Sequence, residues 1–132
     1  MTFASVQTTL ETFFKTQWTY TAIEFENDSL DTNGLDEFVR FSIQFGDGKP
    51  MALGNKEFRY PAVLFVQIFN RPAVGNARSM ILADLASALF RTTLSLLPIK
   101  FHVPVVLKIP KIDAGFIQTQ VSCSFYFEEI SP

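Results

Sequence analysis

The sequence has few of the residues on which catalytic and metal sites most often depend. It contains one cysteine, Cys123, and one histidine, His102, in 132 residues. A lone cysteine excludes an internal disulfide and a cysteine-based metal cluster, so nothing indicates an oxidising compartment. No apolar run approaches the roughly 20 residues that span a bilayer. The first residues carry Glu11 and no basic stretch, so we expect neither a signal peptide nor a membrane-spanning helix.

Charged residues are also scarce, whereas phenylalanine is abundant. Asp, Glu, Lys and Arg make up 18% of the chain, against roughly 25% in an average domain, and 15 residues are phenylalanine. A domain of this length has difficulty burying so many large rings in one core. Obligate subunit interfaces resemble a core cut in half, so we expect some of the rings to lie between subunits. The alternative is a phenylalanine-rich core in a chain without a partner.

The charges that are present are unevenly distributed along the chain. Residues 1–37 hold seven acidic residues against Lys15 alone, a net charge of −6. Residues 38–127 hold ten Lys or Arg against four acidic residues, a net charge of +6. This pattern suits a head-to-tail contact, in which different surfaces of identical subunits meet. Two solvated faces of a monomer would explain it equally well.

Two segments have the periodicity of amphipathic helices. Apolar residues recur at spacings of three and four over residues 2–16. A second helix is expected to begin at Asn76, as its N-cap, and to end before Pro98. Its apolar face is predicted to consist of Ile81, Leu82, Leu85, Ala88, Leu89 and Leu96. Its polar face is predicted to carry Asp84, Ser87, Arg91 and Ser95.

Five segments have the composition or the alternation of strands: residues 18–25, 38–45, 58–69, 99–110 and 115–127. The third is a dense apolar run, as in a strand buried on both faces. The second and the fifth alternate between a buried face and a mostly wet face, and Phe38 is expected on the mostly wet face of the second. Prolines limit the fourth to an edge strand or a connector. The connection that begins at Gly46 and runs to about Asn55 is expected to be a contact arm.

These elements predict one α+β domain over residues 1–132. We expect a mostly antiparallel, mixed and twisted sheet of four to five strands, with two main helices packed on one face. The strand of residues 58–69 and the helix after it are the smallest unit able to nucleate the core. The remaining elements are expected to pack around this unit.

Residues of catalytic type form no convincing constellation. His102 stands between Phe101 and Val103, which favours a core or interface position over a catalytic base. Cys123 falls on the apolar face of the last strand and is expected to be a small buried hydrophobe, with a Cys123–His102 dyad as the alternative. We therefore expect no enzymatic activity and no cofactor.

The acidic and glycine-containing loops do not match known ligand-binding loops. An EF-hand loop aligned on Gly34 would place Ser29 first and Arg40 last, and both are wrong ligands. A looser divalent-ion site is an alternative to a solvated acidic rim, with candidate ligands Glu24, Glu26, Asp28 and Asp31. Residues 46–49 lack the spacing of a phosphate-binding loop. The basic residues are scattered, so binding of free nucleic acid is not indicated.

Several short motifs follow one another in a distinctive order. Trp18 comes after the N-terminal helix, and Ile23-Glu24-Phe25-Glu26-Asn27 forms the end of a strand. Val66-Gln67-Ile68-Phe69 lies in the central strand, and Gly75-Asn76 forms the turn before the second helix. Leu82-Ala83-Asp84 lies within that helix. The last strand carries Gln118, Gln120 and Val121 before Phe125.

In this order and spacing the motifs resemble those of tail terminator (tail completion) proteins of long-tailed bacteriophages. That family has a tryptophan before an I-x-F-E-N strand, a V-Q-I-F strand, a glycine-containing turn and an L-A-D helix. The resemblance covers nearly the whole chain. Phe38-Val39-Arg40 departs from it, because a tryptophan–arginine pair is expected there, and Pro98–Pro110 is richer in proline and apolar residues than expected.

The resemblance implies a structural virion protein, not an enzyme. Such proteins form a hexameric ring on the head-proximal end of the finished tail tube, stop its polymerisation and offer a surface to the neck and head completion proteins. The implied partners are therefore further copies of this chain, the tail tube protein and a neck protein, with viral DNA passing through the pore without sequence-specific binding. The implied location is the head-proximal end of the virion tail, after assembly in the host bacterial cytoplasm and without a membrane.

We expect the acidic loop of residues 26–37 and the basic region of residues 49–78 to meet across subunits or to line the lumen. The candidate residues are Glu26, Asp28, Asp31, Asp36, Glu37, Lys49, Lys56, Arg59, Arg71 and Arg78. One alternative function is another head–tail joining (neck) ring protein. Another is a small-molecule-binding or enzymatic α+β domain that uses His102 and the apolar sheet face.

Overall fold

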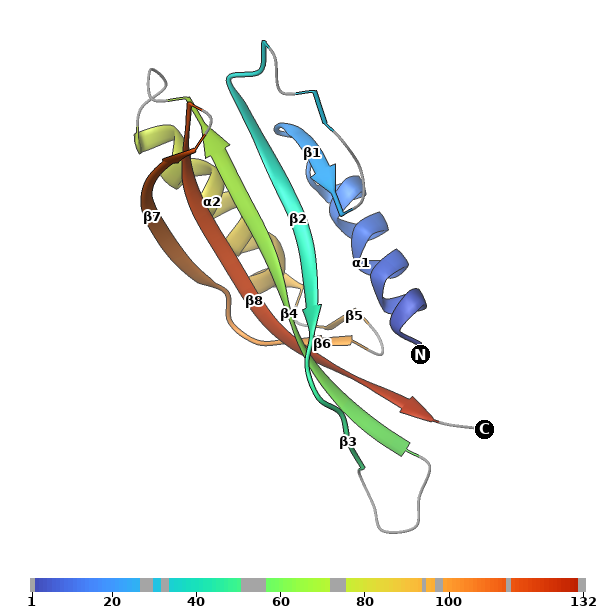
Figure 1. Ribbon diagram of the computed structural model, residues 1–132. Helices are drawn as coiled ribbons and strands as arrows, with labels where there is room; N and C mark the ends of the chain where they lie inside the picture. Colours follow the sequence, from blue (N-terminus) through green and yellow to red (C-terminus); the bar gives the residue numbers. More distant parts are fainter. Residues whose placement is uncertain are drawn as a thin grey trace.

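The fold is a twisted sheet with both long helices on one face (Figure 1). A computed structural model describes residues 2–26, 30–31, 34–50, 57–71, 76–93, 95–96, 99–113 and 115–130. The elements are α1 (Phe3–Gln17), β1 (Ala22–Phe25), β2 (Glu37–Phe45), β3 (Lys49–Pro50), β4 (Glu57–Asn70), α2 (Asn76–Thr92), β5 (Ser95–Leu96), β6 (Ile99–Phe101), β7 (Val105–Asp113) and β8 (Phe116–Ile130). The predicted α+β class is confirmed.

Within the described residues the sheet has eight strands, more than the four to five predicted. Its order is β1-β2-β4-β8-β6-β5, with β3 also paired to β4 and β7 also paired to β8. β1 lies parallel to β2, and the other pairs are antiparallel, so the predicted mixed and mostly antiparallel sheet is confirmed. The additional strands β3, β5 and β6 are two or three residues long, too short to show alternation in the sequence.

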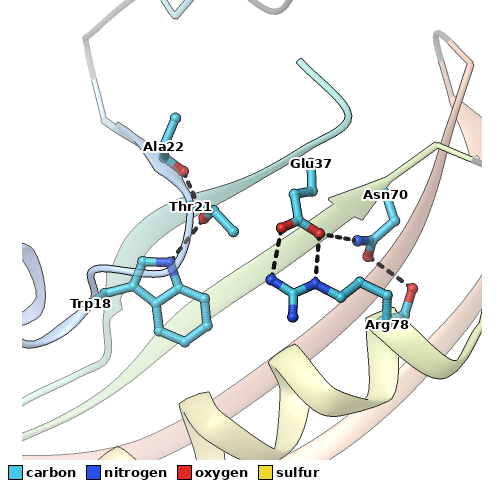
Figure 2. Close-up of polar contacts among 7 residues, drawn as sticks. Trp18, Thr21, Ala22, Glu37, Asn70 and Arg78 are labelled. Carbon is cyan, nitrogen blue, oxygen red and sulfur yellow. Dashed lines mark hydrogen bonds and ion pairs between the residues drawn. The ribbon is translucent and has the colours of Figure 1, made fainter. Parts of the chain in front are cut away.

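Helix α1 begins and ends with local hydrogen bonds. Thr2 is the N-cap and forms a capping box with Ser5, which satisfies amide donors of the first turn. The backbone N–H of Trp18 donates to Phe14 O at 2.8 Å and closes the last turn. The predicted strand at residues 18–25 is therefore too long at its start, because Trp18 ends the helix and β1 begins at Ala22. The Trp18 indole donates to Thr21 Oγ1 at 2.9 Å (Figure 2).

The two helices meet over the inner face of the sheet, which we define as the face they cover. Phe14 of α1 stacks on Phe90 of α2 at 6.3 Å between ring centroids, and on Phe41 of β2 at 4.8 Å. Most inner residues of the central strands are buried, and Phe45 and Tyr60 are partly buried. The buried ones are Val39, Phe41, Ile43, Ala62, Leu64, Val66, Ile68, Val121, Cys123, Phe125 and Phe127. The predicted arrangement of both helices on one face is confirmed.

The central strand β4 is not buried on both faces as the apolar run predicted. Leu64 and Val66 on the inner face are buried, whereas Val63 and Phe65 on the outer face are partly exposed. Because neither α1 nor α2 packs on the outer face, β4 has the alternating burial of an antiparallel sheet with one covered face.

Helix α2 packs through a different face and is shorter than predicted. Ile81 is 49% exposed, whereas Ser87, predicted to be polar-facing, is 2% exposed. Ala83 and Ala86 are buried beside Phe90, so small residues let the helix approach the sheet closely. The helix ends at Thr92, and predicted helical residues Ser95 and Leu96 pair with β6 instead. The predicted cap side chain of Asn76 and the positions of Gly75 and Pro98 lie outside the described residues.

A second apolar cluster covers one end of the outer face. Phe38, Phe69 and Phe116 are 3–4% exposed and pack against Leu30 and Leu35 of the connection between β1 and β2. Phe38 and Phe69 stack at 4.7 Å between centroids. The expectation that Phe38 lies on a mostly wet face is therefore wrong, because this connection folds back over the sheet there.

Candidate functional site

The sheet ends in an exposed apolar strand. Val105 and Leu107 of β7 are 61% and 55% exposed, Val106 is 36% exposed and Val103, just before the strand, is 69% exposed. In the described part of the chain β7 pairs with β8 alone, so its other edge presents backbone groups without a strand partner. Apolar edge strands of this kind are templates for contact with another chain. The sequence predicted an edge strand here but not the exposure of its side chains.

The outer face of the sheet continues from β7 as a largely polar surface. Leu107 pairs with Gln120, which pairs with Gln67, which in turn pairs with Arg40. Val105 similarly pairs with Ser122 in the next row. The exposed apolar residues of β7 therefore form one border of a polar sheet face. An apolar strip beside a polar rim is typical of protein–protein contact surfaces.

One end of the sheet has a polar network that joins β2, β4 and α2 (Figure 2). The Arg78 guanidinium donates to both Glu37 carboxylate oxygens at 2.8 and 3.0 Å. The Asn70 amide donates to Glu37 Oε2 at 3.2 Å and accepts from Ser79 Oγ at 2.8 Å. Hydrogen bonding to Glu37 raises the pKa of Arg78, so the guanidinium stays charged. Two predicted interface residues, Glu37 and Arg78, therefore contact each other within one chain.

The Asn70 side chain is expected to be the most sensitive member of this network. Asn70 is fully buried and Ser79 is 3% exposed. Asn70→Ala removes the acceptor of the buried Ser79 hydroxyl and one of the two donors to Glu37 Oε2, so the free energy of unfolding should fall by about 1–3 kcal/mol. Urea unfolding measures this loss. Gln67→Ala, which removes an amide from the partly exposed outer face of the same strand, is the control and should change stability by less than about 1 kcal/mol.

Other candidate residues lie close to the same end of the sheet. The Arg71 backbone N–H donates to Asp36 O, its Nε donates to Leu35 O at 2.9 Å, and its guanidinium lies 4.4 Å from the centre of the Phe116 ring. Asp31 and Asp36 are exposed. Asp28 and Lys56 lie outside the described residues.

Two of the four carboxylates considered for a divalent ion, Glu24 and Glu26, are hydrogen-bonded within the protein itself. Glu24 accepts from Arg40 Nε at 2.8 Å, and Glu26 accepts from the Ile43 backbone N–H at 2.6 Å. Among the described residues, no group of three or more His, Cys, Asp or Glu side chains is placed to hold a metal ion. For Glu24 and Glu26 the structure therefore favours the alternative of a polar rim.

Lys49 and Arg59 lie at the opposite end of the sheet, on a pocket of about 510 Å³. His102, Ser124 and Tyr126 contribute to the same wall. Arg59 is bound to Glu128 at 2.7 Å and lies 4.5 Å from the centre of the Tyr126 ring. Gly48 packs so closely against Tyr60 that a Cβ at this position would lie 2.2 Å from the ring. This packing explains the glycine, so a phosphate-binding role is not needed to account for it. Sequence reasoning did not find this pocket, because its residues come from strands and connections far apart in the chain.

His102 and Cys123 do not form a dyad. Cys123 lies on the inner face and its Sγ is 3.2 Å from the backbone carbonyl of His102, whereas the His102 ring lies 5.9 Å from the ring of Tyr126 on the outer face. His102 is exposed, so a core position is also wrong, and its proposed interface position stays a prediction. Cys123 is buried as expected.

The Cys123 thiol is expected to react slowly in the folded chain. Burial raises its pKa to about 11, so at pH 8 the thiolate population should be about a hundredfold below that of an unperturbed thiol. Iodoacetamide labelling followed by mass spectrometry should show slow modification in buffer and fast modification in urea. Equal rates in the two solutions would contradict the burial. Because the folded pKa is the higher one, this thiol stabilises the fold below its unfolded pKa and less as the pH rises towards 11.

Comparison with known protein families and with curated proteins gave no match. No helix within the described ranges is long and apolar enough to cross a membrane.

Proposed function

We propose that this chain is a structural protein of a long-tailed bacteriophage that forms a ring on the head-proximal end of the tail tube. In this role it ends tube polymerisation and offers the neck proteins a surface for head attachment. The observation that carries the proposal is the exposed apolar edge of the sheet at β7, with Val105 and Leu107 more than half exposed. Such an edge in a small domain favours assembly with further chains.

The arrangement of the sheet favours a ring of identical subunits. The β7 edge is on one side of the sheet and the short strand β1 is on the other, so the two sides differ in length and in composition. A contact that uses different surfaces of identical subunits is heterologous, and it closes into a ring when the rotation between neighbours fits. The uneven charge of the chain supports the same kind of contact.

The resemblance to tail terminators supplies the specific role. Its motifs occupy structurally important positions: Trp18 closes α1, and residues 66–69 lie near the C-terminal end of β4, between β2 and β8. Leu82 and Ala83 of α2 are buried. A family resemblance carried by core and capping residues supports a shared fold, and through it the role in the virion, a six-membered ring and passage of DNA through its lumen.

A tube assembly assay tests the role. Tail tube protein from the same genome is polymerised alone or with this chain, and tube lengths are measured by negative-stain electron microscopy. We expect added chain to stop elongation and to appear as density at one end of each tube. Unchanged tube lengths, together with binding to the portal side of a neck complex, would instead support the alternative of a neck ring protein.

A further inference from the structure

The pocket at the Lys49 end of the sheet combines positive charge with an aromatic wall. Lys49 and Arg59 are direct neighbours across β3 and β4, and Arg59 lies over the Tyr126 ring. His102 also lines the pocket, 5.9 Å from Tyr126 between ring centroids. Strands β4 and β8 run past the end of β2 here and project beyond the helices at the bottom of Figure 1. The pocket is therefore reachable by another molecule.

The charge around this pocket favours a carboxylate ligand. Lys100 is exposed and pairs in register with Tyr126, which adds a third cation to Lys49 and Arg59. Among the described side chains at this end, Asp47 and Glu128 are the carboxylates that offset them, and Glu128 does so through its ion pair with Arg59. Lysine and arginine beside an aromatic ring and a hydroxyl, here Ser124, are typical of sites that bind carboxylates.

The Asp36 carboxylate of the same chain lies too far away to fill the pocket. Asp36 is exposed and is held beside Arg71 by the hydrogen bond between their backbones. Arg71 and Arg59 are twelve positions apart along β4 and its end, which corresponds to roughly 40 Å of extended chain. We call the end of the sheet that carries Asp36 the acidic end. Asp36 of one copy and the basic pocket of another are opposite in charge, and within one copy they cannot meet.

We propose that this pocket binds the acidic end of a second copy, with the Asp36 carboxylate placed among Lys49, Arg59 and His102. The contact joins opposite ends of two identical chains, so it is heterologous and repeats from copy to copy. This inference rests on the proposed ring and identifies one of its contacts. It also makes Lys49 and Asp36 partners of each other. Both residues are expected from the sequence to lie at an interface.

A charge exchange tests the contact. Lys49→Asp and Asp36→Lys are each expected to weaken self-association about tenfold or more at low salt, because each places like charges opposite one another. The double variant Lys49→Asp/Asp36→Lys should recover to within about threefold of the original chain. Lys15→Asp on α1 and Asp84→Lys on α2 are matched controls at exposed positions and should change association by less than about threefold. Sedimentation over a concentration series measures all five variants.

A cross-linking experiment separates failure of this contact from failure of the ring. Asp36→Cys/Lys49→Cys is treated with a short bis-maleimide and should give a ladder of linked subunits on a denaturing gel. Each single cysteine variant should remain unlinked, because its partner position is a native residue. Rings without a ladder, or a double exchange that does not recover, would overturn the contact and leave the ring intact. A chain that never associates would overturn both.

Discussion

Replacing Val105 and Leu107 together by lysine is expected to prevent assembly while the chain stays folded. Both side chains are more than half exposed and point to the outer face, so they contribute little to the core. Surface changes of this kind usually alter stability by less than about 0.5 kcal/mol each. At a contact between subunits they would place two charges in an apolar surface, and removing such charges from water is costly.

The expected size of this effect is a loss of association of about a hundredfold or more, measured by native mass over a concentration series. Ile81→Lys is the matched control, since Ile81 is an apolar residue of α2 that is 49% exposed. It should assemble as the original chain does. Urea unfolding of the double variant should give nearly the original midpoint. Normal assembly of the Val105 and Leu107 variant would mean that β7 is not the contact edge.

Phe14→Ala is expected to cause the largest loss of stability of any single change considered. Phe14 is fully buried where α1, α2 and β2 meet, and it stacks on Trp18, Phe41 and Phe90. Truncation of a buried phenylalanine costs about 3–5 kcal/mol, because transfer energy is lost and a cavity remains. Domains are stable by about 5–15 kcal/mol, so a large share of the total is removed.

The unfolding midpoint in urea, followed by far-UV circular dichroism, measures this change at a concentration where the chain is monomeric. Phe3→Ala is the control on the same helix, because Phe3 is 38% exposed although its ring contacts Phe45, Tyr60 and Phe127. Its loss should be less than half that of Phe14→Ala. Equal losses for the two variants would contradict the central position of Phe14.

The elements predicted well from sequence are those whose burial is set by local alternation. Apart from Phe38, residues of β2 and β8 alternate largely as expected, with Val121, Cys123, Phe125 and Phe127 of β8 on the buried side. Helix α1 was placed within one residue of its observed ends. In these elements the covered face coincides with the most apolar face, so periodicity alone was sufficient.

The errors occur where tertiary contacts override local pattern. Helix α2 turns its small residues Ala83, Ala86 and Ser87 to the sheet, where they are buried together with Leu82 and Phe90. Phe38 is buried against Leu30 and Leu35 of the connection between β1 and β2, a contact that the periodicity of the sequence does not predict. Residues that pair across long sequence separations, such as Glu37 with Arg78, could not be assigned to one chain or to two from charge alone.

The candidate site was predictable in composition but not in geometry. An excess of apolar residues and an uneven charge were visible in the sequence, and they led to the expectation of subunit contacts. The register of β4 with β3 and β8 decides that Lys49, Arg59 and Tyr126 share one pocket. Strand register depends on pairings across the whole sheet, so local sequence does not reveal it.

The most direct test of a ring is native mass spectrometry over a concentration series, with negative-stain imaging of the largest species. We predict closed rings with a mass of about six subunits, the number that the resemblance implies. These rings should become more abundant as the concentration rises, and they should be lost in the Val105 and Leu107 lysine variant. Tail tube protein is added as a template wherever the free chain is monomeric. A chain that stays monomeric at every concentration, and does not form rings on added tube protein, would contradict the account.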